Sequence, residues 1–123
     1  NTPPVFPIFT TLLTLRWLKN LGGVEAIESI NDQKAELIYN EIDRNSLFTG
    51  HADIDSRSTM NATFKLLDEG HKDAFNEAWA SAGISGINGH RSIGGYRASM
   101  YNALPLESVK VLVDVMNELE RTR

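Results

Sequence analysis

Residues 60–66 read MNATFKL and show the clearest alternation of apolar and polar side chains in the sequence. Successive side chains of a β-strand point to opposite faces of a sheet. The apolar side chains of this stretch therefore share one face, and the polar side chains share the other. We predict a strand over residues 60–66 that is buried on one face only.

A second alternating stretch, YRASMY at residues 96–101, predicts another strand of the same small sheet. Tyr96 and Ala98 belong to one face of this strand, whereas Arg97 and Ser99 belong to the other. Arg97 is therefore expected on the face opposite to the core.

Helical periodicity accounts for the residues around these strands. Residues 72–82 carry one apolar helical face, and Gly83 is placed to end that helix. A short strand is expected just before Gly89. Pro105 is a favourable first residue for a last helix, because apolar residues follow it at helical spacing to about residue 120.

The N-terminal half is predicted to be mainly helical. Three prolines indicate an extended lead-in over residues 1–8. An apolar run over residues 9–21 predicts a helix that is buried on most sides, and a pair of glycines interrupts it. Residues 24–44 predict a second helix with an imperfect apolar stripe, followed by a polar loop over residues 45–58 with room for a short strand.

These elements together predict an α+β fold in which helices cover one face of a small antiparallel sheet. The chain has 123 residues, which suits one domain. Its net charge of −4 gives no reason to expect nucleic-acid binding, and no apolar run approaches the ~20 residues that span a membrane. The sequence holds no cysteine, which excludes thiolate metal sites and fits a cytoplasmic protein. No metal-ligand spacing is found, so no metal is expected.

The candidate functional segment is GHRSIGGYR at residues 89–97, a glycine-rich turn that leads into a predicted strand. His90, Arg91 and Arg97 place three potential cations close together. Glycine lets the backbone approach a ligand closely, and each guanidinium can bind a carboxylate or phosphate with two hydrogen bonds. A ligand that carries both a phosphate and a carboxylate would satisfy them. A hairpin whose arginines face water or pair with acids explains the same spacing.

The longer stretch GHRSIGGYRASMYNALPLE, residues 89–107, closely resembles the phosphoserine aminotransferase family, which reads GHR-x-x-GG-x-RAS-x-YNA-x-PLE here. Shorter matches lie at NTPP (1–4), WLK (17–19), GGV (22–24) and QKAEL (33–37), so the resemblance covers essentially the whole chain. Thr59 and Thr63 depart from the family, which often has arginine and proline there.

The resemblance implies the C-terminal small domain of an enzyme with the aspartate-aminotransferase fold (fold type I, by class α/β), spanning residues 1–123 with a lead-in over 1–8. It implies a cytoplasmic homodimer that uses pyridoxal 5'-phosphate to move an amino group between glutamate and 3-phosphohydroxypyruvate, giving 2-oxoglutarate and phosphoserine. This is a step of serine biosynthesis, and in some bacteria a related step serves vitamin B6 biosynthesis.

The family's cofactor is held as a Schiff base by a lysine of the large domain, upstream of this region. None of the lysines here lies in that motif: Lys19, Lys34, Lys65, Lys72 and Lys110. The resemblance therefore implies a chain without catalytic residues, inactive alone.

The family's binding residues map onto five positions. By their motifs, His90 and Arg91 resemble the pair that contacts the substrate phosphate, and Arg97 resembles the arginine that pairs with the substrate α-carboxylate. Asn1 and Thr2 resemble the pair that reaches the cofactor phosphate of the neighbouring subunit.

Two other functions fit the sequence. One is a non-catalytic anion-binding or interaction module that kept this domain. The other is the small domain of another class-V aminotransferase, such as an alanine–glyoxylate aminotransferase. The pair His90 and Arg91 argues against the second alternative, because a substrate without phosphate gives it no partner.

Overall fold

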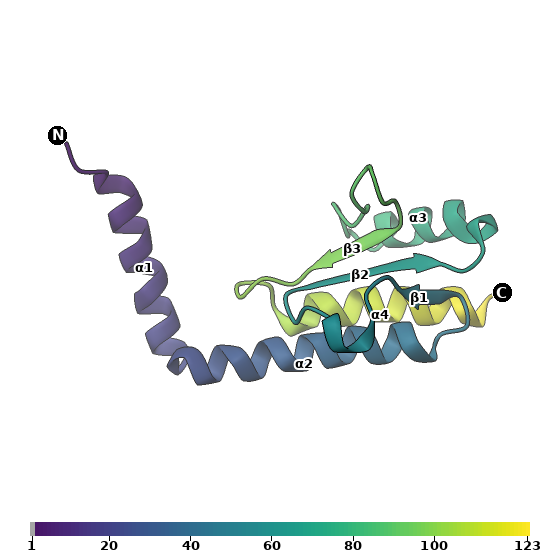
Figure 1. The fold of residues 1–123 in the computed structure, drawn as a ribbon, viewed down its shortest axis with the longest axis horizontal. Coiled ribbons are helices and arrows are strands. Elements are labelled where there is room, and N and C mark those ends of the chain that lie inside the picture. Colours follow the sequence, from purple (N-terminus) through teal and green to yellow (C-terminus); the bar gives the residue numbers. More distant parts are fainter. Residues whose placement is uncertain (1) are drawn as a thin grey trace. The chain divides into compact units, whose positions relative to one another are not determined.

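The structure is a computed structural model that describes residues 2–123 (Figure 1), and the chain divides into two compact units, Asn1–Ile30 and Asn31–Arg123. The first unit contains helix α1, Val5–Leu21, and the first turns of helix α2, Gly23–Arg44. Helix α1 ends at Gly22, whose φ of 117° is left-handed, the conformation that glycine adopts most readily.

The extended lead-in predicted for residues 1–8 is too long, because α1 already begins at Val5 and includes Pro7. Proline fits the first helical turn, where the backbone N–H has no partner within the helix and φ near −65° is already helical. The helix is under way at Ile8, whose N–H donates to the Pro4 carbonyl at 3.2 Å.

The prediction that this helix is buried on most sides is also wrong. No residue of α1 is buried, and Phe6 remains 75% exposed. An apolar run indicates that a helix is covered by something, but it does not place the cover in the same chain. The first unit contains too little chain to enclose a helix of this length.

The second unit is a three-stranded antiparallel sheet with helices on one face, as the alternation predicted. The strands lie in the order β1-β2-β3. Their bounds are Phe48–Gly50, Asn61–Leu66 and Tyr96–Ser99. Helix α3 spans Lys72–Ser81 and helix α4 spans Leu106–Arg121. Two short 3-10 helices complete it, Ile54–Ser56 and Glu69–His71.

Two sequence predictions for the strands need correction. The short strand expected before Gly89 is a single bridge between Asn88 and Tyr96. The last strand ends at Ser99 and does not continue to residue 101. A stretch of alternating residues shows which side chains share a face, but the hydrogen-bond partner decides where pairing stops.

The core lies between the sheet and the helices α2, α3 and α4. Four rings at its centre, Phe48, Phe64, Phe75 and Tyr96, make edge or stacked contacts with centroids 4.8–6.4 Å apart. Figure 1 shows α2 and α4 running side by side along the sheet, and the Asn45 side chain joins them by donating to the Met116 carbonyl at 3.1 Å. The helices therefore all cover one face, and the side chains of Arg97 and Thr63 stay on the other.

The glycine-rich loop between α3 and β3 closes on itself. Gly89 N–H donates to the Gly95 carbonyl at 2.8 Å, and Gly94 N–H donates to the His90 carbonyl at 2.8 Å. A Cβ atom at Gly89 would lie 2.0 Å from the Gly94 carbonyl oxygen, a distance that no folded backbone tolerates. Gly94 has a φ of 75° but open space around it. The loop therefore requires glycine at these two positions for different reasons.

The segment between β1 and β2 is fixed to α2 by Arg57. Its two terminal nitrogens donate to the two carboxylate oxygens of Asp43 at 2.6 Å each, and its guanidinium lies 4.6 Å from the centre of the Tyr39 ring. The Tyr39 hydroxyl donates to the Ser58 carbonyl at 3.0 Å. The hydrogen bonds from Arg57 hold the pKa of Asp43 below its ordinary value.

We expect Gly89→Ala to destabilise the protein more than Gly94→Ala. Gly94→Ala adds only the strain of a left-handed alanine, about 1 kcal/mol, whereas Gly89→Ala must displace the backbone of Gly94 and Gly95 on the opposite side of the loop. Denaturant unfolding measures both losses, and backbone amide shifts of residues 89–95 report the displacement. Equal losses of unfolding free energy in the two variants, with unchanged amide shifts, would contradict the close approach of Gly89 to the Gly94 carbonyl.

We expect Arg57→Met to lower the free energy of unfolding at neutral pH by about 1 kcal/mol, the upper end for a partly exposed ion pair. The pKa of Asp43 is lowered in the folded state, so its stabilising effect is present above the unfolded pKa of about 3.9 and is lost as the pH falls. The difference between the two proteins should thus shrink below about pH 4. Lys110→Met, whose ammonium lies 3.8 Å from Glu107 on an exposed face, is the control. A difference in unfolding free energy between the protein and Arg57→Met that stays constant down to about pH 2 would argue against a contribution from this ion pair.

Candidate functional site

The outward face of the sheet carries the candidate site. Thr63 on β2 pairs in register with Arg97 on β3, so the two side chains lie next to each other. They line a depression of about 390 Å³ together with Lys65, and the loop with His90 forms one of its walls. The site is thus built by the open side of two paired strands and by the glycine-rich loop.

Arg97 is the best-positioned cation in the depression. Its backbone is fixed on both sides, since β3 pairs with β2 and the Arg97 N–H donates to the Ile87 carbonyl at 2.6 Å. Its side-chain Nε is buried without a hydrogen-bond partner, and its guanidinium forms no ion pair with any carboxylate in the described part of the chain. A half-buried guanidinium without a counter-ion is a strong anion-binding group.

His90 presents one ring nitrogen to solvent. The backbone N–H of Ser92 donates to Nδ1 of His90 at 3.3 Å, and the Ser92 hydroxyl lies 2.7 Å from the same atom. A backbone N–H can only donate, so Nδ1 is the acceptor and the neutral ring carries its proton on Nε2. The exposed Nε2–H is then available to a ligand.

The structure gathers only some of the five predicted binding residues. His90 and Arg97 line the same depression, whereas Arg91 lies on the exposed turn of the loop and is not among the lining residues. Thr2 is exposed in the first unit, and Asn1 lies outside the described residues.

Sequence reasoning missed three further basic residues that line the depression, His51, Lys65 and Lys72. His51 lies in the segment predicted to be a polar loop, and its side chain is exposed. Its N–H, however, donates to the Thr63 carbonyl at 3.0 Å and so continues the pairing of β1 with β2. The alternation already placed Lys65 on the outward face. What the sequence lacked was the register that sets this face against Arg97.

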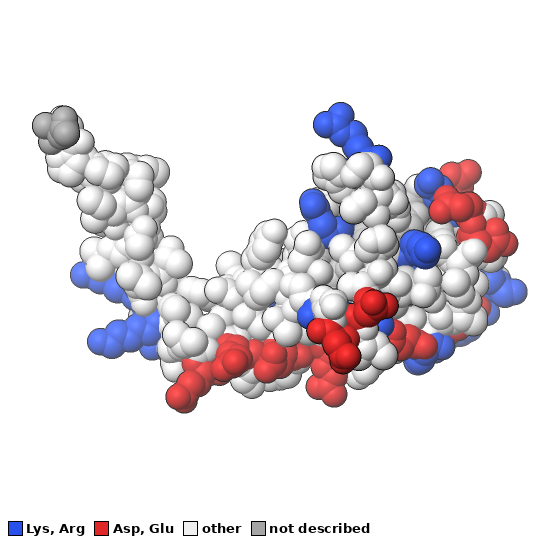
Figure 2. Space-filling model, viewed as in Figure 1, with Lys and Arg blue, Asp and Glu red and all other residues white. Residues whose placement is uncertain are grey.

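Positive charge dominates the depression. Glu69 is the only carboxylate among the lining residues, and Lys72 neutralises it at 3.1 Å. This leaves Lys65 and Arg97 without an acidic partner among the described residues, and Figure 2 shows Lys and Arg side chains around the loop between α3 and β3 while acidic side chains follow α2.

Tyr96 keeps its proton in this setting. Burial, together with the nearby Glu69 and Asp73, raises the pKa of Tyr96, so its phenol stays protonated and donates to Asn76 at 3.0 Å.

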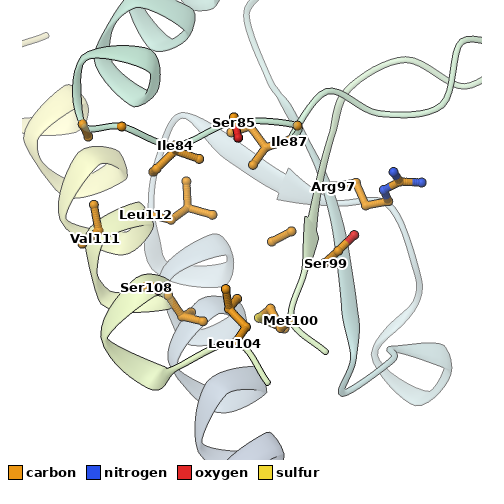
Figure 3. Close-up of a pocket in the computed structure, with 15 residues that line it drawn as sticks. Ile84, Ser85, Ile87, Arg97, Ser99, Met100, Leu104, Ser108, Val111 and Leu112 are labelled. Atoms are coloured by element: carbon orange, nitrogen blue, oxygen red, sulfur yellow. The ribbon is translucent and has the colours of Figure 1, made fainter. Parts of the chain in front are cut away.

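A second hollow, of about 360 Å³, lies between β3 and α4 and is mainly apolar. Figure 3 shows Ile84, Leu104 and Leu112 around it, with the Arg97 guanidinium pointing away from them. Because Arg97 is its only charged lining residue and is directed elsewhere, this hollow does not contribute to anion binding.

The chemistry available in the depression is binding of anions by charge-assisted hydrogen bonds. Among residues 2–123 no three metal-ligating side chains are grouped to hold an ion, and no helix is long and apolar enough to cross a bilayer. Lys34, although fully buried, is engaged by three backbone carbonyls and cannot present a free amine to a cofactor.

Comparison with known proteins identifies the family. The model of the class-V aminotransferases matches residues 1–112. The chain is 68% identical over 120 residues to the phosphoserine aminotransferase of Flavobacterium psychrophilum and 58% identical to that of Flavobacterium johnsoniae. Each match covers 98% of this chain and 34% of the relative, so the chain spans about a third of the length of these enzymes.

Solved structures agree in fold. The phosphoserine aminotransferase of Bacillus circulans subsp. alkalophilus superposes with a TM-score of 0.92 at 44% identity, over 100% of this chain and 34% of that one. The enzyme of Trichomonas vaginalis with bound PLP gives a TM-score of 0.85 at 34% identity, over 95% of this chain and 34% of that one. The small antiparallel sheet with its helices is therefore the arrangement found in these enzymes, and the chain belongs to the class-V aminotransferase family.

Proposed function

We propose that the chain is the C-terminal small domain of a phosphoserine aminotransferase, including residues 1–8, and that it binds the anionic groups of the substrates. The observation that carries this proposal is Arg97, a half-buried guanidinium without a carboxylate partner in the described part of the chain, next to His90 in a depression of uncompensated positive charge. The 68% identity to a phosphoserine aminotransferase supports the choice of substrates.

Arg97 binds the α-carboxylate that glutamate and phosphoserine share. A carboxylate is planar and accepts two parallel hydrogen bonds, which suits a guanidinium held by a paired strand. The backbone of Arg97 is fixed by β2 on one side and by Ile87 on the other, so the side chain starts from a rigid base.

His90 and Arg91 bind the phosphate of phosphoserine or 3-phosphohydroxypyruvate. The exposed Nε2–H of His90 is one donor, and Arg91 follows directly in the chain. Arg91 does not line the depression in this structure, so its side chain must turn toward a phosphate held beside His90. The rotatable bonds of an exposed arginine allow this.

The cofactor chemistry belongs to the complete enzyme. Pyridoxal phosphate, when bound, supplies the electron sink for amino-group transfer. The donors in the depression suit carboxylate and phosphate groups of substrates and offer no lysine that matches the family's cofactor motif. We assign Asn1 and Thr2 to the cofactor phosphate of the neighbouring subunit, in a cytoplasmic homodimer.

Two alternatives lead to different measurements. A non-catalytic module would bind phosphate and carboxylate compounds without any role in amino transfer. Another class-V aminotransferase would use a substrate without phosphate, which gives His90 no anionic partner. Amino transfer from phosphoserine by the intact protein separates both from our proposal.

Residues 1–123 alone should show no amino transfer, because covalent binding of the cofactor requires a lysine amine that this stretch does not supply. Added pyridoxal phosphate should give no visible aldimine absorbance on the protein, and after borohydride reduction and gel filtration no pyridoxyl group should remain covalently bound to it. Stable labelling of one lysine of this chain, abolished when that lysine is replaced by methionine, would contradict the inference that the cofactor lysine lies in another part of the enzyme.

In the intact enzyme, Arg97→Ala should reduce kcat/KM for glutamate and for phosphoserine alike, because both carry an α-carboxylate. Arg91→Ala should reduce kcat/KM for phosphoserine much more than for glutamate, which has no phosphate. A charge-assisted hydrogen bond contributes roughly 1.5–3 kcal/mol, so each reduction should be at least about tenfold.

Arg121→Ala is the matched control, since Arg121 is an exposed arginine paired with Glu118 at the end of α4, and it should change neither value. Equal losses for both substrates in Arg91→Ala would rule out the phosphate role of Arg91.

A further inference from the structure

Lys34 is the most deeply buried charged residue of the second unit, with no exposed surface. No carboxylate neutralises it. Its ammonium donates to three backbone carbonyls, of Met100 at 3.0 Å, Tyr101 at 3.0 Å and Leu104 at 3.2 Å. Burial lowers the pKa of Lys34, and the three carbonyls accept hydrogen bonds from its side-chain nitrogen.

An ammonium is a costly side chain to bury at this position. Taking an ammonium out of water is unfavourable, and neutral carbonyls compensate for it only in part. The three donors of the ammonium match three carbonyl groups of the connection between β3 and α4, of which that of Tyr101 also accepts from the Leu104 N–H at 2.9 Å. The specific result of this arrangement is that Lys34 holds one short piece of backbone in place.

That piece of backbone, residues 100–104, connects β3 to α4. The Met100 carbonyl follows the end of β3, and the Leu104 carbonyl precedes Pro105, the cap residue directly before α4. Asn31, one turn before Lys34 on α2, also contacts this segment by donating to the Asn102 side chain at 2.8 Å. Helix α2 therefore clamps the exit of β3 at several points.

The exit of β3 begins at Met100, three residues after Arg97. Strand β3 has only four residues and lies at the edge of the sheet, so the backbone of Arg97 is fixed by few contacts, the pairing with β2 and the hydrogen bond to Ile87. Beyond Ser99 its pairing continues only through the Met100 N–H, which donates to the Met60 carbonyl at 2.8 Å. Lys34 binds the carbonyl of that same Met100. A rotation at Met100 would turn β3 and move the guanidinium at the end of the long Arg97 side chain.

We propose that Lys34 is a positioning residue for the substrate carboxylate site: its buried ammonium fixes the backbone after β3 and thereby aims Arg97. The inference rests on the proposed function of Arg97 and adds a residue that does not touch the substrate. It gives α2 a part in substrate binding, although this helix lies on the far side of the core from the depression.

The test uses the intact enzyme with Lys34→Met, Arg97→Ala and the double variant. Lys34→Met keeps the length of the side chain and removes the ammonium. We expect it to raise KM for glutamate and phosphoserine by a similar factor, about fivefold or more, with a smaller change in kcat. In the double variant KM should equal that of Arg97→Ala alone within about twofold, because Lys34 acts through Arg97.

Two control variants separate positioning from general stability. Lys110→Met removes an exposed ammonium of α4 and should change neither KM nor the thermal midpoint. Leu119→Ala opens the core at the other end of α4 and should lower the thermal midpoint without raising KM. If Lys34→Met fails to fold, Lys34→Gln keeps two donors for the carbonyls and should give a smaller rise in KM of the same kind.

The outcomes are distinguishable. Unchanged KM in folded Lys34→Met or Lys34→Gln overturns the inference, and so does a double variant in which the two effects multiply. If Arg97→Ala itself leaves KM unchanged, the proposed function of Arg97 fails first. Non-additive effects together with a normal KM in Leu119→Ala support the positioning role.

Discussion

The antiparallel register of β2 and β3 is the constraint on which the rest of the second unit depends. Ala62 lies opposite Ala98, and Thr63 lies opposite Arg97. Because side chains alternate along a strand, a slip by one residue would place Arg97 in the core and Ala98 in solvent. The packed rings of Phe64 and Tyr96, 5.6 Å apart, oppose such a slip. The same pairing therefore builds the core on one face of the sheet and gathers cations on the other.

Helix α2 adds what apolar packing cannot supply, a unique position for each neighbouring segment. Glu41 is buried and accepts hydrogen bonds from Asn45 at 2.7 Å and from Asn117 on α4 at 3.0 Å. Lys34 fixes the exit of β3, and Asp43 fixes the segment that leads to β2 through Arg57. Buried polar groups contribute little net stability, but they penalise every arrangement in which they lose their partners. The sheet thus rests on apolar packing, and its exact placement rests on polar contacts from one helix.

The sequence predicted those parts of the fold that local patterns determine. Alternation located β2 and the faces of β3, and helical spacing located α4, because these signals lie within a few residues. The start of α1 was misplaced because proline disrupts the interior of a helix but is well tolerated in its first turn. The exposure of α1 was missed because an apolar run does not indicate which part of the protein, or which other chain, packs against it. Within the site, the glycine-rich segment itself pointed to His90 and Arg97, and the resemblance supplied their proposed ligands. His51 and Lys65 join them only through strand pairing, which no local pattern encodes.

Under the proposed function, substrate binding and cofactor chemistry are divided between this domain and the rest of the enzyme. The basic side chains of the depression would bind substrates with two anionic groups, and the two lysines that line it, Lys65 and Lys72, do not lie in the family's cofactor-lysine motif. A chain with a net charge of −4 keeps this attraction local, because acidic side chains follow α2 while Lys65 and Arg97 have no acidic partner on the outward face. An uncompensated guanidinium destabilises the free domain slightly, and a bound anion would relieve that cost. In the proposed function the same charge imbalance therefore favours substrate binding, and the proposed part of Lys34 is to hold the strand that carries Arg97.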